Sequence, residues 1–177
     1  MKRINNLFEQ VIKWEHLYDS FLKAMKGTGK TDASCKFFFY YEKEITRLQK
    51  ELDDESYQPG RYHYYKIHDP KQRIIAVAPF RDRVVHHAIV SILTPIYENC
   101  FIFDSYATRK NKGTHLAICK SQKFMRQSTW YLKSDIEKFF DTVDHDIMIY
   151  RVKRKVKDPK LLNLIEKLIR NTPSGQG

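Results

Sequence analysis

Residues 130–148, WYLKSDIEKFFDTVDHDIM, decide the expected fold, because an apolar and aromatic run leads directly into a series of acidic residues. The run TWYLKSD at 129–135 predicts a buried β-strand that ends at Asp135. A carboxylate left unpaired at the end of a buried strand is costly, so Asp135 calls for a cation or several hydrogen-bond donors. Mg2+ takes oxygen ligands and often uses one or two carboxylates together with phosphates. Asp135 is therefore a candidate metal ligand, and a helix N-cap for a segment beginning at Ile136 is the structural alternative.

The other acidic residues of this stretch have simpler explanations. Asp144 is a predicted N-cap for the helix that follows, and Asp146 is a favourable negative charge in the first turn of that helix. Glu137 is expected to be a solvated side chain, and Asp141 is compatible with either kind of role. The hypothesis of a catalytic or metal-binding site therefore rests on Asp135.

The overall charge of the chain points to a phosphate-bearing partner. Thirty-two Lys and Arg against 21 Asp and Glu give a formal net charge of +11, and the basic residues interleave with aromatic and polar ones. This pattern favours nucleic-acid binding over charge that serves only solubility. The three cysteines are widely spaced without a CxxC pair, and neither a signal-peptide core nor a run of ~20 apolar residues is present. A cytoplasmic protein without a disulfide framework or zinc site is expected.

Hydrophobic periodicity predicts a helix-rich α+β chain. Two aromatic and β-branched runs, RYHYYKIHD at 61–69 and RIIAVAP at 73–79, flank a Pro-containing turn and predict a β-hairpin. Asp158 followed by Pro159 predicts the N-terminus of a last helix, since Asp is a favoured N-cap and Pro a favoured first helical residue. The predicted helices cover about 5–26, 35–52, 80–95 (kinked or ended by Pro95), 114–126, 147–155 and 159–170.

Three sequence blocks in this order resemble motifs of reverse transcriptases. SDIEKFFDTVDHDIM at 134–148 resembles their first catalytic motif, in which an Asp at the end of a palm strand is followed by a short turn and an aromatic pair. RIIAVAPFRDRVVHHAI at 73–89 resembles the fingers motif of group II intron enzymes, and FDSYATRKNKGTHLAI at 103–118 resembles the next block. Within the superfamily the blocks look most like the enzymes of diversity-generating retroelements, with retron and group II intron enzymes as near neighbours.

The resemblance implies an α+β right-hand polymerase fold with fingers and the start of a palm. Residues 1–56 would form an N-terminal helical segment, 57–128 the fingers, and 129–177 the first part of the palm. The implied function is an RNA-directed DNA polymerase that copies RNA into cDNA by two-metal nucleotidyl transfer with Mg2+. The implied partners are template RNA, a primer, deoxynucleoside triphosphates and, for the retroelement type, a small basic accessory protein.

The resemblance also assigns roles to individual residues. Asp135, with the backbone carbonyl of Ile136 beside it, would hold the catalytic metal ions, and Phe140 would pack under the incoming sugar and disfavour a 2′-hydroxyl. Phosphoryl transfer depends mainly on positioning and charge neutralisation, which metal ions and Arg side chains supply. The remaining assigned residues are Arg73, Lys66 and Lys71 for gripping the triphosphate, Arg81 and Arg83 for touching template or triphosphate, and Ser105, Tyr106, Arg109, Lys110 and Lys112 for lining the template path.

A purely structural role is the alternative for several of these basic residues. Arg81 and Arg83 are equally typical of surface ion-pair residues with Asp82 nearby, and the segment around Arg109 is equally typical of an ordinary basic surface loop. RVKRKVK at 151–157 predicts either a further phosphate-contact face or a solvated helix. The sequence leaves both alternatives open.

The match departs from the family after the first palm motif. The family carries a second carboxylate pair in a Tyr-x-Asp-Asp turn, which is absent from these 177 residues, and TPSGQG at 172–177 resembles only the opening of the next motif. We therefore expect the chain by itself to lack polymerase activity and, with one palm strand and an open edge, to self-associate. A non-catalytic module that binds RNA or an RNA–DNA hybrid is the alternative function, and a metal-dependent nuclease or phosphatase is a weaker one.

Overall fold

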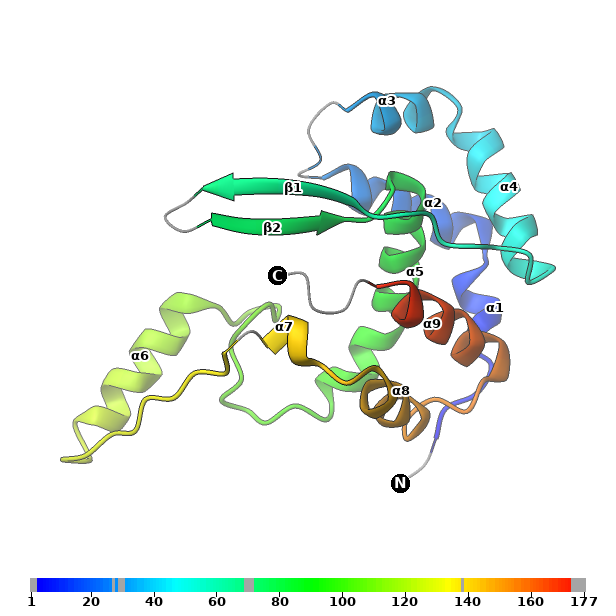
Figure 1. Cartoon of the computed structure of the whole chain (residues 1–177). Helices are drawn as coiled ribbons and strands as arrows, with labels where there is room; N and C mark the ends of the chain where they lie inside the picture. The colour runs from blue at the N-terminus through cyan, green and yellow to red at the C-terminus, as the bar shows by residue number, and fades with distance from the viewer. Residues whose placement is uncertain (1–2, 27, 29–30, 69–71, 138, 173–177) are drawn as a thin grey trace. The chain divides into compact units, whose positions relative to one another are not determined.

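The structure, a computed structural model, describes residues 3–26, 28, 31–68, 72–137 and 139–172, without the side chains of residues 140 and 141. Its contacts divide the chain into two compact units (Figure 1). The first unit comprises residues 1–95 and 138–177, and the second comprises residues 96–137. No helix among the described residues is long and apolar enough to cross a membrane.

Within its described N-terminal residues, the first unit has four helices where the sequence predicted two. Residues 5–26 form α1 (Phe8–Val11) and α2 (Trp14–Met25), because Lys13 takes an extended backbone conformation with φ −55° and ψ 133°. Residues 35–52 belong to α3 (Asp32–Phe39) and α4 (Tyr41–Asp53), which are separated by Tyr40 with φ −118° and ψ 26°. Helical periodicity continues across both breaks, so the pattern of apolar residues did not reveal them.

The core of the first unit is built around stacked and edge-to-face aromatic rings. The ring of Phe37 lies 5.3 Å from that of Phe21 and 5.2 Å from that of Phe80, which brings together α2, α3 and the start of α5 (Phe80–Glu98). Aromatic pairs at these distances add to the stability that burial provides. The fully buried apolar residues of the first unit include Leu17, Ile45, Leu48, Val84, Val85, Ala88 and Leu161.

The predicted hairpin is confirmed. Strands β1 (His63–His68) and β2 (Gln72–Val77) pair antiparallel, and His63 stands opposite Val77 at the base of the hairpin. Helix α5 begins three residues after β2 and continues through Pro95 to Glu98, so Pro95 does not end the helix. Figure 1 shows the hairpin projecting from the helices of the first unit. Its outer part is therefore available to a ligand.

The C-terminal part of the first unit contains α7 (Phe139–Thr142), α8 (His145–Lys153) and α9 (Pro159–Asn171). Both predicted N-caps are confirmed: Asp144 accepts hydrogen bonds from the backbone N–H groups of Asp146 and Ile147, and Asp158 accepts one from Leu161. Each acidic cap satisfies donors that the first helical turn would otherwise leave unpaired.

The second unit contains α6 (Thr114–Met125), which confirms the predicted helix, together with irregular segments before and after it. The predicted buried strand at 129–135 is wrong, because these residues form neither helix nor strand, and Trp130 and Leu132 are 89% and 92% exposed. A strand forms only when another strand accepts its hydrogen bonds. In the described part of the chain, the hairpin is the only sheet, and residues 129–135 pair with neither of its strands.

Candidate nucleotide and nucleic-acid interface

The hairpin carries two of the predicted triphosphate-binding residues, and it places them on opposite faces. Its register pairs Ile67 with Arg73 and Lys66 with Ile74. Residues paired across two strands share a face, whereas neighbours along one strand alternate. The side chains of Lys66 and Arg73 therefore project from opposite faces of the hairpin. Lys71 lies outside the described residues.

Both faces of the hairpin also expose apolar side chains. Tyr64 and Ile74 accompany Lys66 and are 48% and 37% exposed, whereas Tyr65 and Ile75 accompany Arg73 and are 58% and 40% exposed. An isolated two-stranded hairpin is only marginally stable in water. Exposed apolar patches of this kind mark surfaces that bind a partner or ligand. Cations beside aromatic and aliphatic groups suit a ligand that carries phosphates and bases.

The base of the hairpin is held by a buried carboxylate at the start of α5. Asp82 is 3% exposed and accepts hydrogen bonds from the hydroxyl of Tyr57 (2.6 Å) and from the backbone N–H of Gly60 (2.7 Å). Burial, and then the hydrogen bond to Asp82, raises the pKa of Tyr57 well above its ordinary value, so the phenol remains a donor. A Cβ at Gly60 would come within 2.9 Å of Pro79 Cγ, so only glycine permits this close approach. The segment that leads into the hairpin is thereby fixed to α5.

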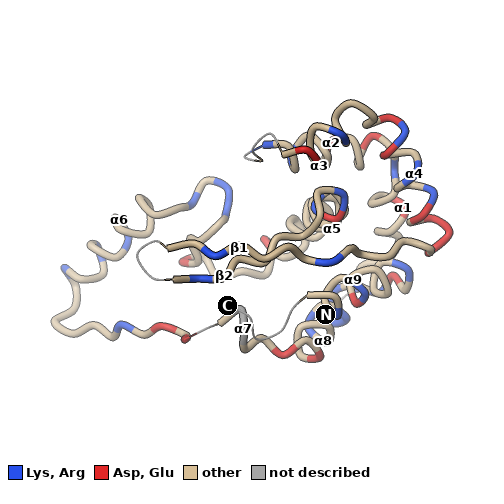
Figure 2. Tube along the Cα trace, turned by 45° about the horizontal axis from the view of Figure 1, so that its top comes forward, with Lys and Arg blue, Asp and Glu red and all other residues tan. Residues whose placement is uncertain are grey.

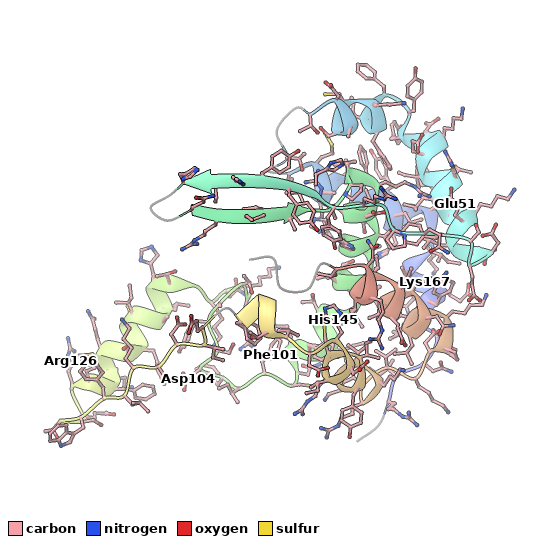
Figure 3. The ribbon with its side chains drawn as sticks, viewed as in Figure 1. Glu51, Phe101, Asp104, Arg126, His145 and Lys167 are labelled. Carbon is pink, nitrogen blue, oxygen red and sulfur yellow. The ribbon has the colours of Figure 1, made fainter. Side chains whose placement is uncertain are left out.

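The two arginines that flank this carboxylate are engaged within the protein. Arg81 forms an ion pair with Glu51 of α4, which is labelled in Figure 3, and its guanidinium lies 5.3 Å above the ring of Tyr57. Arg83 donates to the Thr28 hydroxyl at 3.2 Å, and its guanidinium lies 5.1 Å above an aromatic ring of α5. Asp82 turns into the core and is not the ion-pair partner of either arginine. These contacts agree with the ion-pair alternative for Arg81.

In the second unit, Arg109 organises the basic loop between α5 and α6. Its guanidinium makes a fork with the Glu98 carboxylate, at 2.8 and 3.0 Å to Oε2 and 3.2 Å to Oε1. It also donates to the backbone carbonyls of Ile102 and Ser105, each at 3.0 Å, and lies 5.3 Å above the ring of Phe101. The side chain is only 11% exposed. Arg109 therefore fixes the shape of the loop before any ligand binds.

Other loop residues add further internal contacts. Lys112 donates to the carbonyl of Phe103 at 2.7 Å and lies 3.6 Å above the ring of that residue. Tyr106 donates to Asp104 at 2.9 Å, and partial burial raises the pKa of its phenol. Ser105 is half-buried, and Lys110 is exposed with no acidic partner within the described part of the chain. Lys110 is thus the cation of this predicted template path that is most open to a ligand.

The candidate catalytic residue Asp135 is exposed, as is Ile136 beside it, in the irregular segment after α6. Among the described residues, no group of three or more His, Cys, Asp or Glu side chains is placed to hold a metal ion. Asp135 by itself offers a single carboxylate, whereas a two-metal centre requires several ligands. The predicted roles of Asp135 and Ile136 stay predictions. The backbone of Phe140 lies in α7, and its side chain lies outside what the structure describes.

Comparison with known proteins identifies the family. Residues 66–176, which include the outer part of the hairpin, the basic loop and Asp135, match the sequence profile described as "Reverse transcriptase (RNA-dependent DNA polymerase)". The chain belongs to the reverse transcriptase family. Reverse transcriptases act on RNA templates with primers and deoxynucleoside triphosphates and use divalent metal ions. The polymerase resemblance of the three sequence blocks is confirmed.

Several relatives of this chain have names that refer to introns. The group II intron-encoded protein LtrA of Lactococcus lactis subsp. cremoris is 27% identical over 162 residues, which cover 90% of this chain and 26% of LtrA. Protein YkfC of Escherichia coli is 30% identical over 135 residues, or 72% of this chain and 35% of YkfC. Nuclear intron maturase 1 of Arabidopsis thaliana is 34% identical over 87 residues, or 49% of this chain and 12% of that protein. The chain thus spans about a quarter of the length of LtrA, and the assignment to the diversity-generating type stays a prediction.

Sequence reasoning missed the residues that hold this chain's basic side chains in place. Glu51 and Glu98 each bind a predicted nucleic-acid-contact arginine, and Tyr57 supports the carboxylate at the hairpin base. The turn signal YQPG at 57–60 was the available clue to the close approach at Gly60. The acidic partners gave no local signal, because Glu51 lies 30 positions before its arginine and Glu98 lies 11 positions before Arg109.

Proposed function

We propose that this chain forms the fingers and the first part of the palm of an RNA-directed DNA polymerase. The observation that carries the proposal is the projecting hairpin, which exposes Lys66 and Arg73 together with apolar side chains on both faces. In the family motif that this segment resembles, the hairpin closes over the incoming nucleotide. The assignments of 1–56 to an N-terminal helical segment, 57–128 to the fingers and 129–177 to the palm are part of this proposal.

Asp135 is proposed as one ligand of the catalytic Mg2+ ions, with the carbonyl of Ile136 beside it. Its carboxylate is exposed and thus open to a hydrated cation, which supports the role. Two-metal catalysis needs further carboxylates, and the described residues do not assemble them. We therefore expect residues 1–177 alone to be inactive in nucleotide addition.

The proposed substrates are a template RNA, a primer and deoxynucleoside triphosphates. Arg73 and Lys66 would contact the triphosphate from the two faces of the hairpin, and Lys110 would contact the template backbone. Phe140 would exclude a ribose 2′-hydroxyl. Arg109 and Lys112 would act mainly by holding the loop that presents Lys110, because their cationic groups are already bound to Glu98 and to carbonyls of the loop.

Primer extension by the product of the complete reading frame tests this function. The assay measures incorporation of deoxynucleotides on an RNA template with Mg2+. We expect the substitution Asp135→Asn to reduce the rate by about a thousandfold or more, because it removes a charge that neutralises the metal ions. The matched substitution Asp144→Asn, at an exposed helix cap of the same acidic stretch, should leave the rate within about threefold.

One result would contradict the metal-binding role of Asp135, and another would contradict the polymerase assignment itself. One is primer extension that survives in the Asp135→Asn protein. The other is salt-sensitive RNA binding without any extension by the complete protein, which is the behaviour of a non-catalytic binding module. Arg73→Ala should raise the KM for deoxynucleotides with a smaller change in kcat, since a triphosphate grip contributes mainly to substrate binding.

A further inference from the structure

A basic patch on α8 lies outside the proposed nucleotide and template contacts. Tyr150, Lys153 and Arg154 recur at positions i, i+3 and i+4 of the helix and so share one face. Together with Arg3 they line a shallow pocket of about 360 Å3 in the first unit. Figure 2 shows the basic positions of α8 beside the N-terminal end of the chain. Three cations and one aromatic ring thus surround a single depression.

Arg3 reaches this patch through backbone hydrogen bonds. The N–H of Ile4 donates to the carbonyl of Lys155 at 2.9 Å, and the N–H of Lys157 donates to the carbonyl of Ile4 at 2.7 Å, which forms a parallel bridge between Ile4 and Val156. Val156 is fully buried, so the bridge is anchored in the core. The N-terminus is therefore positioned beside a helix some 150 positions later in the sequence.

The patch carries positive charge that the surrounding protein only partly neutralises. In the part of the chain that the structure describes, Arg3 and Arg154 have no acidic partner, and neither does Lys157 just beyond α8. Lys153 lies 3.4 Å from a carboxylate oxygen of Glu166, but both side chains are partly exposed, and such pairs contribute little. Clustered cations repel one another in the free protein, and an anionic ligand would relieve this repulsion.

Tyr150 adds a flat apolar surface to the charged patch. Its side chain is 61% exposed, and its ring stacks on no other aromatic ring among the described residues. An exposed aromatic ring between cations that can bind phosphates is the arrangement that binds single-stranded nucleic acid, because bases stack on the ring while phosphates meet the charges. We propose that Arg3, Tyr150, Lys153 and Arg154 form a second binding site for single-stranded RNA.

The same observations argue against an anionic membrane as the partner. A helix that lies on a membrane must present its apolar side to the lipid. In α8 that side is divided, because Ile149 is buried and Val152 is half-buried whereas Ile147 and Met148 are 58% and 38% exposed, so the helix offers lipid only part of an apolar face. The patch lies on α8, whereas the segment that enters the hairpin is bound by α9, whose Asn171 side-chain amide donates to the Gly60 carbonyl at 3.0 Å.

Fluorescence anisotropy with residues 1–177 tests the RNA site directly. The probe is a labelled oligouridylate of about 12 nucleotides, which is within the range that such sites cover. The double substitution Lys153→Gln/Arg154→Gln should weaken binding about tenfold and reduce the slope of log affinity against log salt by about 1.4, which corresponds to two lost phosphate contacts on a single strand. The control Lys43→Gln/Lys50→Gln makes the same change in net charge on exposed positions of α4 and should change affinity by less than about twofold.

A second pair of substitutions separates stacking from charge. Tyr150→Leu should weaken binding about fivefold or more without changing the salt slope, whereas Tyr150→Phe should keep nearly full affinity because it retains the ring. Circular dichroism verifies that each variant is folded. Because this binding assay does not measure nucleotide addition, its outcome is separate from that of the primer-extension experiment.

Equal affinity losses for the α8 and α4 double variants would overturn the proposal, since binding would then depend only on net charge. Unchanged affinity of the Tyr150→Leu protein would overturn the stacking site. Sedimentation with phosphatidylserine vesicles provides the membrane arm of the test. If the α8 substitutions abolish vesicle binding and leave RNA affinity unchanged, the patch is a lipid-binding surface and the RNA proposal is wrong.

Discussion

Replacement of Asp158 by Ala should destabilise the first unit far more than the loss of an ordinary helix cap. The Asp158 side chain is 6% exposed, and one carboxylate oxygen accepts a hydrogen bond from Leu161 at the start of α9. The other oxygen accepts hydrogen bonds from the backbone N–H groups of Leu7 and Phe8, each at 2.9 Å. One buried carboxylate therefore serves two helices that lie 150 positions apart in the sequence.

The magnitude follows from these three contacts. Loss of a helix N-cap costs about 1 kcal/mol. Each backbone donor left buried without a partner costs about 1–3 kcal/mol, and the substitution leaves two of them, on Leu7 and Phe8. We expect a total loss of about 3–7 kcal/mol in the free energy of unfolding. For a chain of this size, about 1 kcal/mol shifts Tm by about 2–4 °C, so Tm should fall by about 6–28 °C.

The matched control is Asp144→Ala, because Asp144 is also an Asp N-cap with two backbone donors but is exposed and serves only α8. It should cost about 1 kcal/mol. Chemical unfolding followed by circular dichroism measures both variants, and Asp158→Asn, which retains one acceptor oxygen, should lie between them. If Asp158→Ala costs no more than Asp144→Ala, the hydrogen bonds to Leu7 and Phe8 do not stabilise the fold, and the reasoning is wrong.

Three further predictions concern the hairpin base, the basic loop and pH. Tyr57→Phe should lower the free energy of unfolding by about 1–3 kcal/mol in chemical unfolding, because it leaves the buried Asp82 carboxylate with one donor fewer; an unchanged value would refute this. Arg109→Lys should weaken RNA binding about as much as Arg109→Gln, because a lysine cannot reproduce the two-pronged hydrogen bonding to Glu98. If the lysine variant instead kept the affinity of the unmodified chain for RNA, the charge of Arg109 alone would matter, and the prediction would be wrong. Burial lowers the pKa of His86 below its ordinary value of 6.5. As pH falls, His86 is therefore protonated in the unfolded chain before it is protonated in the folded protein. The free energy of unfolding should then decrease below about pH 6.5, by at most about 1.4 kcal/mol per pH unit. His86→Gln should flatten this decrease in unfolding experiments between about pH 7 and pH 5, and an unaltered profile would exclude His86 as its cause.

The sequence by itself determined the features that depend on a few neighbouring residues. The hairpin at 63–77 and the N-caps Asp144 and Asp158 were predicted correctly. Turn residues, capping side chains and β-branched runs act on hydrogen bonds within a few positions, so a short stretch contains the information needed. The same locality explains why the family motifs at 73–89, 103–118 and 134–148 were sufficient to identify a reverse transcriptase.

Tertiary structure decided what depends on distant partners. It pairs Glu51 with Arg81, and it brings the Asp158 carboxylate into hydrogen-bonding distance of the backbone at the start of α1. It also places Arg3 and Tyr150 in the lining of one pocket. The predicted strand at 129–135 is wrong for the same reason, because its apolar residues favour a strand but only a neighbouring strand accepts its hydrogen bonds. Local propensity therefore specifies which elements a segment favours, whereas burial and hydrogen bonding between distant segments decide which of them form and which charges meet.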